Sequence, residues 1–231
     1  MISSTASSLA AADNHMEKHT DLNRQGTSLT VSNVKRIQGK AVLTLSSGEV
    51  YSMPRSMLKE RPYRGGMPFD KASFLSFLTE RSYPFAMEKA VSLLACRART
   101  EKEIEEALQK NAYPEKTIAH VMQRLHESGY INDREFAEHW ITSRTSKGLG
   151  TRKIRMELRQ KGVAAEDVDE ILSQVEDDDL MAGAVKAAQK AMRGKDLSDP
   201  TDKQKIMMAL ARRGFDYSTA RAAIEQIMSQ D

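Results

Sequence analysis

Apolar residues follow two different periods along this chain of 231 residues. Between Leu29 and Met53 they alternate with polar residues, as they do in half-buried β-strands. The turn-forming sequence Ser46-Ser47-Gly48-Glu49 interrupts the alternation, so we predict a β element of two or three strands with a hairpin turn here. A sheet this small is not stable alone, and we expect it to pack on the segments that follow.

The next stretch is rich in proline and glycine and holds one short predicted helix, Arg55–Glu60. Asp70 can cap a second helix that runs to about Glu80, with Phe74 on its apolar face. We expect Pro84 to end that element, because proline removes a helical hydrogen bond.

Beyond residue 85 the apolar pattern is helical, and it occurs three times. The three windows share one set of offsets: Ile104, Leu108, Tyr113, Ile118, Val121, Met122 and Leu125; Ile154, Leu158, Val163, Val168, Ile171, Leu172 and Val175; Ile206, Leu210, Phe215, Ala220, Ala223, Ile224 and Ile227. At the same offset in each window stand Ala112, Gly162 and Gly214, where a helix would end in a left-handed residue. Each window is therefore predicted to be a helix, a tight turn and a second helix.

One more helix precedes each pair, with Leu93 and Trp140 at matching positions in the first two units. The third unit is looser: an Ala-rich helix, Leu180–Met192, is followed by a longer loop. Capping residues agree with this division. They are Thr100 with Glu103, Thr201 with Gln204, Thr151 at the comparable position, and Asn132 or Asp133.

These elements predict a mainly α protein, in which three tandem three-helix repeats form an elongated array behind a small N-terminal β element. We expect a disordered tail at residues 1–28, which are polar and lack a hydrophobic period. The β-hairpin and short helices occupy residues 29–84, and the repeats occupy residues 85–131, 132–176 and 177–231.

Composition narrows the class of protein. The net charge of +3 is too mild to indicate a nucleic-acid binder, so any basic site requires local clustering. Cys96 is the only cysteine, which excludes an intramolecular disulfide and favours a reducing compartment. We expect it to be a small buried side chain. No segment is typical of a membrane span or a signal peptide, so we expect a cytoplasmic protein.

Basic residues cluster in the middle repeat. Arg152, Arg155 and Arg159 share one sector of a helix beside its buried side, and Arg144, Lys147 and Lys153 flank them. The other two repeats lack this stripe. Such a surface can contact phosphates or an acidic protein groove. It can equally be a solvated helix face, and the sequence leaves both interpretations open.

Other candidate chemistry is weaker. Gly148 and Gly150 lie outside a phosphate-loop motif and indicate a loop between helices, although backbone amides there could assist a phosphate contact. Trp140 is expected in the core rather than as a base-stacking platform. The acidic run at residues 176–179 indicates a solvated helix start. His15 and His19 have metal-binding spacing without a third ligand. We therefore expect no metal, no cofactor and no enzymatic activity.

Three segments resemble the signature motifs of the RecX family. They are Gly129-Tyr130-Ile131-Asn132-Asp133 followed by Phe136-Ala137; Gly150 with Ile154, Glu157-Leu158 and Lys161-Gly162-Val163; and Ala90 with Leu93-Leu94, Arg97, Arg99-Thr100 and Ile104.

The resemblance implies a regulator that binds RecA protein or its filament on single-stranded DNA. It would limit filament growth, ATP hydrolysis, strand exchange and co-protease activity. The alternatives are a helical repeat module that binds single- or double-stranded DNA independently of RecA, and a helical adaptor for another protein.

Overall fold

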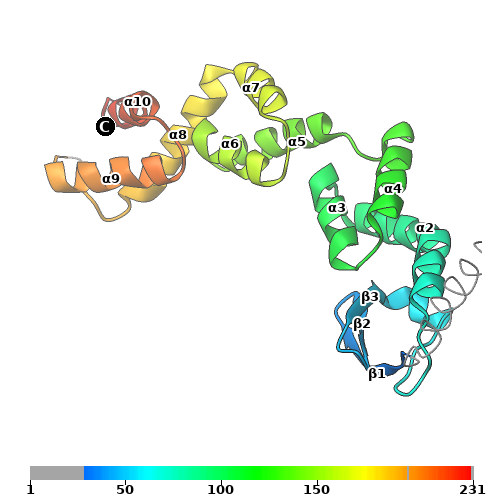
Figure 1. The fold of residues 1–231 in the computed structure, drawn as a ribbon. Coiled ribbons are helices and arrows are strands. Elements are labelled where there is room, and N and C mark those ends of the chain that lie inside the picture. The colour runs from blue at the N-terminus through cyan, green and yellow to red at the C-terminus, as the bar shows by residue number, and fades with distance from the viewer. Residues whose placement is uncertain (1–28, 197, 230–231) are drawn as a thin grey trace, which may run out of the picture. The chain divides into compact units, whose positions relative to one another are not determined.

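The computed structural model describes residues 29–196 and 198–229 (Figure 1). The described chain divides into two units. One holds residues 29–85 together with Lys110–Pro114, and the other holds residues 86–109 and 115–229. The predicted disordered tail, with its pair His15 and His19, lies outside the described residues.

The first unit is built on a three-stranded antiparallel sheet, as predicted. Strands β1 (Val31–Ile37), β2 (Lys40–Leu45) and β3 (Val50–Pro54) follow one another in the order β1-β2-β3. The predicted turn at residues 46–49 joins β2 to β3, and the short helix η2 (Arg55–Lys59) is a 3-10 helix.

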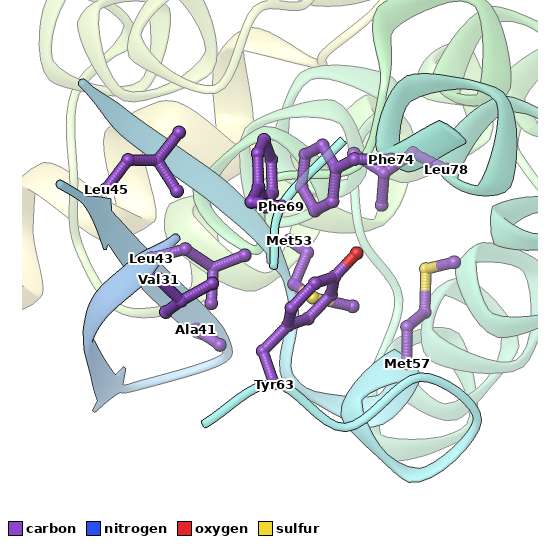
Figure 2. Close-up of a cluster of buried hydrophobic side chains, with 10 residues drawn as sticks. All are labelled: Val31, Ala41, Leu43, Leu45, Met53, Met57, Tyr63, Phe69, Phe74 and Leu78. Atoms are coloured by element: carbon purple, nitrogen blue, oxygen red, sulfur yellow. The ribbon is translucent and has the colours of Figure 1, made fainter. Parts of the chain in front are cut away.

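One face of this sheet carries the core of the first unit (Figure 2). Leu43 of β2 and Met53 of β3 are fully buried, and Phe74 from the following helix packs against them. Phe69 and Phe74 lie with ring centroids 5.1 Å apart, and Tyr51 and Tyr63 surround them. The sheet is thus stabilised by a helix, as its small size requires.

Helix α2 (Lys71–Cys96) is longer than predicted, and Pro84 lies inside it. The expectation that Pro84 ends the element is wrong. A proline removes one helical hydrogen bond, but packing on both sides of it outweighs that loss. Leu78 joins the core of the first unit, whereas Ala86 and Ala90 are fully buried in the second.

Cys96 is the last residue of α2 and is exposed, so the expectation of a buried cysteine is also wrong. Its apolar neighbours in sequence suggested burial. The buried residues Ala86 and Ala90 are separated by one helical turn, and Cys96 lies off the row that they define.

The second unit contains the predicted helices. The first repeat continues from α2 with α3 (Glu101–Lys110) and α4 (Glu115–Glu127). The second consists of α5 (Asp133–Ser146), α6 (Thr151–Gln160) and α7 (Ala165–Ser173), and the third of α8 (Asp177–Met192), α9 (Pro200–Arg212) and α10 (Tyr217–Met228). The mainly α fold with three three-helix repeats is confirmed.

The shared pattern marks equivalent buried positions. Ile104, Ile154 and Ile206 have no exposed surface, and the same holds for Leu108, Leu158 and Leu210. The residues that follow the middle helices all have positive φ, 62° at Ala112, 88° at Gly162 and 90° at Gly214. The tight turn predicted at this offset is confirmed in every repeat.

Helix starts follow the predictions in part. The Asn132 side chain caps α5 by accepting the Glu135 N–H, and the acidic run at residues 176–179 begins α8, as expected. In the third repeat the cap is Asp199 rather than Thr201, because Pro200 is already helical. In the second repeat the N-cap is Gly150, and Thr151 is the first helical residue.

Candidate partner-binding surface

Helix α6 carries the predicted basic stripe. Ile154 and Leu158 are its fully buried residues and pack in the core of the second repeat. Arg152 and Arg159 are exposed at its two ends, and Arg155 is half-buried between them. The helix therefore holds the three arginines beside its buried side, as the spacing predicted.

Two members of the predicted site are neutralised within the chain. The Nε of Arg155 donates to Oδ1 of Asp169 at 2.7 Å, and the Nε of Arg144 donates to Oε2 of Glu157 at 2.8 Å. Arg144 is also only 26% exposed. Both cations are therefore less available to a partner than the sequence suggested.

The other four members keep their charge. Among the described residues, the side chains of Lys147, Arg152, Lys153 and Arg159 have no hydrogen-bond or ion-pair partner. We call these four residues the repeat 2 cations. Arg152 lies near enough to Asp216 to help lower the pKa of that carboxyl group, after the hydrogen bonds from Ser218 and Thr219.

The loop before α6 is occupied by the third repeat. The Gly150 N–H donates to the Arg213 carbonyl at 2.9 Å, and the Arg152 N–H donates to the Gly214 carbonyl at 3.2 Å. The guanidinium of Arg213 donates to the Gly148 carbonyl at 3.1 Å. The expectation that backbone amides here could assist a phosphate contact is wrong for Gly150 and Arg152, because the end of α9 already uses them.

Glycine is required where these two segments meet. A Cβ atom on Gly150 would overlap the backbone of Gly214 and Phe215, and one on Gly214 would overlap the backbone of Lys153. A Cβ on Gly148 would come within 2.9 Å of the Gly183 carbonyl oxygen. We call this contact between α6 and α9 the second junction.

A different contact joins the first and second repeats. The Thr100 hydroxyl donates to the Lys161 carbonyl at 2.7 Å, and Lys102 Nζ donates to the Gln160 carbonyl at 3.2 Å. The N-terminus of α3 thus meets the C-terminus of α6, an arrangement that the helix dipoles favour. We call this contact between α3 and α6 the first junction.

Trp140 lies beside the first junction and is half-buried. Its Nε1 donates to Oε2 of Glu157 at 3.0 Å, and its ring stacks on Phe136. The Arg144 guanidinium lies 4.1 Å from the ring centroid, and Lys161 Nζ lies 4.4 Å from it. Trp140 therefore packs on the core, as expected, but also holds two cations by cation–π contact.

Glu103 completes this assembly and replaces the predicted capping box. The Glu103 N–H donates to Thr100 Oγ1, but the carboxylate turns away to Arg97 at 3.0 Å and Lys161 at 2.8 Å. Burial acts to raise the pKa of Glu103, yet hydrogen bonds from Arg97 and Lys161 outweigh it and lower the pKa to about 2. Glu103 therefore stays ionised and fixes Lys161 in the first junction.

The sequence did not predict this assembly, because its residues come from three helices, α3, α5 and α6, and from Arg97 after the end of α2. One signal was available: Trp140 and Arg144 are four residues apart, as are Glu157 and Lys161, so each pair shares a helix face. The pairing of those two faces could not be read from spacing. Within the described part of the chain, no group of His, Cys, Asp and Glu could hold a metal ion. No described helix is long and apolar enough to cross a membrane.

Comparison with known proteins identifies the repeats. Sequence models of the first, second and third three-helix domains of RecX match residues 86–125, 132–172 and 177–224, respectively. The chain belongs to the RecX family. The order of the three RecX domains follows the order of the three repeats in the structure.

Relatives agree with this assignment. The chain is 38% identical over 143 residues to the "Regulatory protein RecX" of Chlorobium phaeobacteroides, covering 62% of this chain and 93% of the relative. It is 29% identical over 198 residues to that of Bacillus velezensis, covering 85% and 75%. A crystal structure of regulatory protein RecX superposes with a TM-score of 0.59 at 24% identity, covering 85% of this chain and 99% of that one, and supports the fold.

Proposed function

We propose that this RecX-family protein regulates RecA by binding RecA or its filament on single-stranded DNA and limiting filament growth. Limited growth would lower ATP hydrolysis, strand exchange and co-protease activity. Membership of a family of regulatory proteins supports a binding role rather than an enzymatic one.

The observation that supports the proposal is the difference in surface charge between the middle helices of the three repeats. The positions equivalent to Arg152, Arg155 and Arg159 are Lys102, Glu105 and Gln109 in α3, and Gln204, Met207 and Ala211 in α9. The repeats share a scaffold, but one of them presents this stripe. We assign the repeat 2 cations, Lys147, Arg152, Lys153 and Arg159, to the partner surface. Arg144 and Arg155, which form ion pairs within the chain, border this surface.

RecA ATPase activity on single-stranded DNA tests this function. Substoichiometric protein should lower the steady-state rate, because limiting filament growth reduces the number of active RecA subunits. A Lys147→Ala, Arg152→Ala, Arg159→Ala variant should lose most of that inhibition. The matched control is Lys116→Ala, Arg124→Ala, Lys186→Ala, which removes three exposed cations from α4 and α8. A rate that wild-type protein leaves unchanged at any ratio to RecA would rule the function out.

DNA binding without RecA is the second candidate, and the unpaired repeat 2 cations favour it too. Binding through phosphates weakens steeply with salt. Capture of RecA from a bacterial lysate, with and without nuclease, separates the candidates. Capture that survives nuclease supports direct binding to RecA, whereas capture that nuclease abolishes supports the DNA module.

A further inference from the structure

The two units of the protein differ in charge. Residues 29–85, which are all of the first unit except Lys110–Pro114, carry nine Lys and Arg side chains against four Asp and Glu side chains. Residues 86–231 carry 24 against 25. The small β unit therefore holds the positive charge of the chain, although the basic stripe that the sequence singled out lies in the repeats.

Four of the nine cations of residues 29–85 lie at one end of the sheet. Lys35 of β1 is paired with Val42, and Lys40 of β2 is paired with Ile37 and Pro54. These positions alternate with the buried residues of β2, so both lysines lie on the face opposite the core. Arg36 pairs with the buried Ala41, so it lies on the core side of the edge strand β1, where it is exposed. The Arg55 N–H donates to the Gly39 carbonyl at 3.0 Å. We call Lys35, Arg36, Lys40 and Arg55 the hairpin cluster.

No acid of the β unit neutralises the hairpin cluster. Among the described residues, none of its four side chains has a hydrogen-bond or ion-pair partner. Glu49 lies at the opposite end of the sheet, in the turn between β2 and β3, and Glu60 is paired with Arg81 at 3.3 Å. Asp70 accepts the Ser73 N–H at the start of α2, and Glu80 of the same helix accepts the Ser76 hydroxyl. The cluster therefore keeps its charge.

We propose that the hairpin cluster binds the sugar-phosphate backbone of a nucleic acid. The cluster places two cations on the outer sheet face, one on the opposite side of the edge strand β1 and one directly after β3. Four unpaired cations around one end of a sheet suit a chain of phosphates. The outer sheet face adds the polar side chains of Asn33, Thr44 and Ser52, and the strands place no aromatic residue on it for base stacking. Binding should therefore be independent of base sequence.

The hairpin cluster fits a nucleic acid better than it fits an acidic protein partner. Protein interfaces centre on buried aromatic and apolar anchors in pockets. The outer face holds Ile37, 48% exposed, and Val50, 60% exposed, which lie on the two different edge strands β1 and β3. The chemistry of this face is thus mainly electrostatic.

Fluorescence anisotropy with labelled oligo-dT, measured on the full chain over a range of salt concentrations and without RecA, tests this proposal. The Lys35→Ala, Arg36→Ala, Lys40→Ala, Arg55→Ala variant should bind at least tenfold more weakly at about 0.1 M salt. Its plot of log affinity against log salt should flatten by about 0.7 for each phosphate that the variant no longer neutralises. A Lys186→Ala, Lys190→Ala, Arg193→Ala, Lys203→Ala control removes the same charge from exposed positions of the third repeat and should keep the wild-type slope.

Three results would overturn the proposal. An unchanged slope in the cluster variant rejects the surface, and an equal loss in the control shows an effect of net charge alone. Loss of polyglutamate binding with oligo-dT binding retained identifies a protein surface instead. Thermal unfolding by circular dichroism should give all variants the wild-type midpoint, because the mutated side chains lie outside the core. Because RecA is absent, failure here leaves the proposed regulation of RecA untouched.

Discussion

The two junctions between repeats perform the same task with different chemistry. At both, the N-terminus of one middle helix meets the C-terminal turn of the next, α3 on α6 and α6 on α9. The first junction uses side chains: the Thr100 hydroxyl, the Lys102 amine and the Glu103–Lys161 ion pair. The second uses two backbone amides and the Arg213 guanidinium, and it depends on Gly150 and Gly214 for close approach.

Because of this difference, we expect the two junctions to respond differently to added side-chain volume and to pH. A contact between backbones tolerates almost no added volume but depends little on pH. A contact built on ion pairs tolerates small changes of shape, but it depends on the protonation of its members. The first junction is therefore controlled by charge, and the second junction is controlled by steric fit.

The largest effect is expected from Gly150→Ala. The φ of Gly150 is −81°, so alanine adds no backbone strain, but its Cβ would overlap the backbone of Gly214 and Phe215. We expect a loss of about 1–3 kcal/mol in the free energy of unfolding. Amide hydrogen exchange should accelerate in α9 and α10. Gly65→Ala, where a Cβ meets only the Ser32 carbonyl oxygen at 3.4 Å, is the control. Equal effects of the two substitutions would contradict the steric account.

Glu103→Gln should weaken the first junction. It removes the charge that two cations share, and we expect a loss of about 1–3 kcal/mol near neutral pH. The pKa of Glu103 is about 2 in the folded protein and near 4.5 when the group is unperturbed. Its contribution is therefore present above pH 4.5 and is lost as the pH falls toward 2.

Denaturant unfolding of wild type and variant across this pH range measures the difference. The two stabilities should converge as the pH falls. A gap that stays constant from neutral pH down to pH 2 would show that the ion pairs contribute nothing. Glu106→Gln, whose partner Lys102 is 3.9 Å away on an exposed face, is the matched control and should have little effect.

The smallest effect is expected at the tight turns. Ala112 has a φ of 62° where the other repeats have glycine. Ala112→Gly removes that left-handed strain and should stabilise the protein by up to about 1 kcal/mol. Gly162→Ala should destabilise it by at least as much, since its Cβ would also come within 2.7 Å of the Lys102 side chain. Chemical denaturation measures the change in the free energy of unfolding for both variants. A destabilising effect of Ala112→Gly would contradict this account.

The sequence pattern predicted the repeats well, because the helices and turns of each repeat are close together in the sequence. The burial of Ile104, Ile154 and Ile206 follows from helical periodicity, and the left-handed turns follow from the residue types at one shared offset. Pro84 misled the prediction, because the propensity of one residue lost to packing on both sides of it. The ion pairs of the basic residues could not be predicted. Asp169 neutralises Arg155 of the stripe and Glu157 neutralises the flanking Arg144, through contacts that sequence spacing does not specify.

The first junction carries its own optical probe. Trp140 is the only tryptophan of the chain, and its indole N–H donates to a carboxylate while two cations lie close to the ring. Its emission should therefore respond when Lys161 leaves the ring. Cys96, the only cysteine, is exposed at the end of α2 and accepts a single dye. Energy transfer from Trp140 to that dye can follow the first junction in this chain without any added mutation.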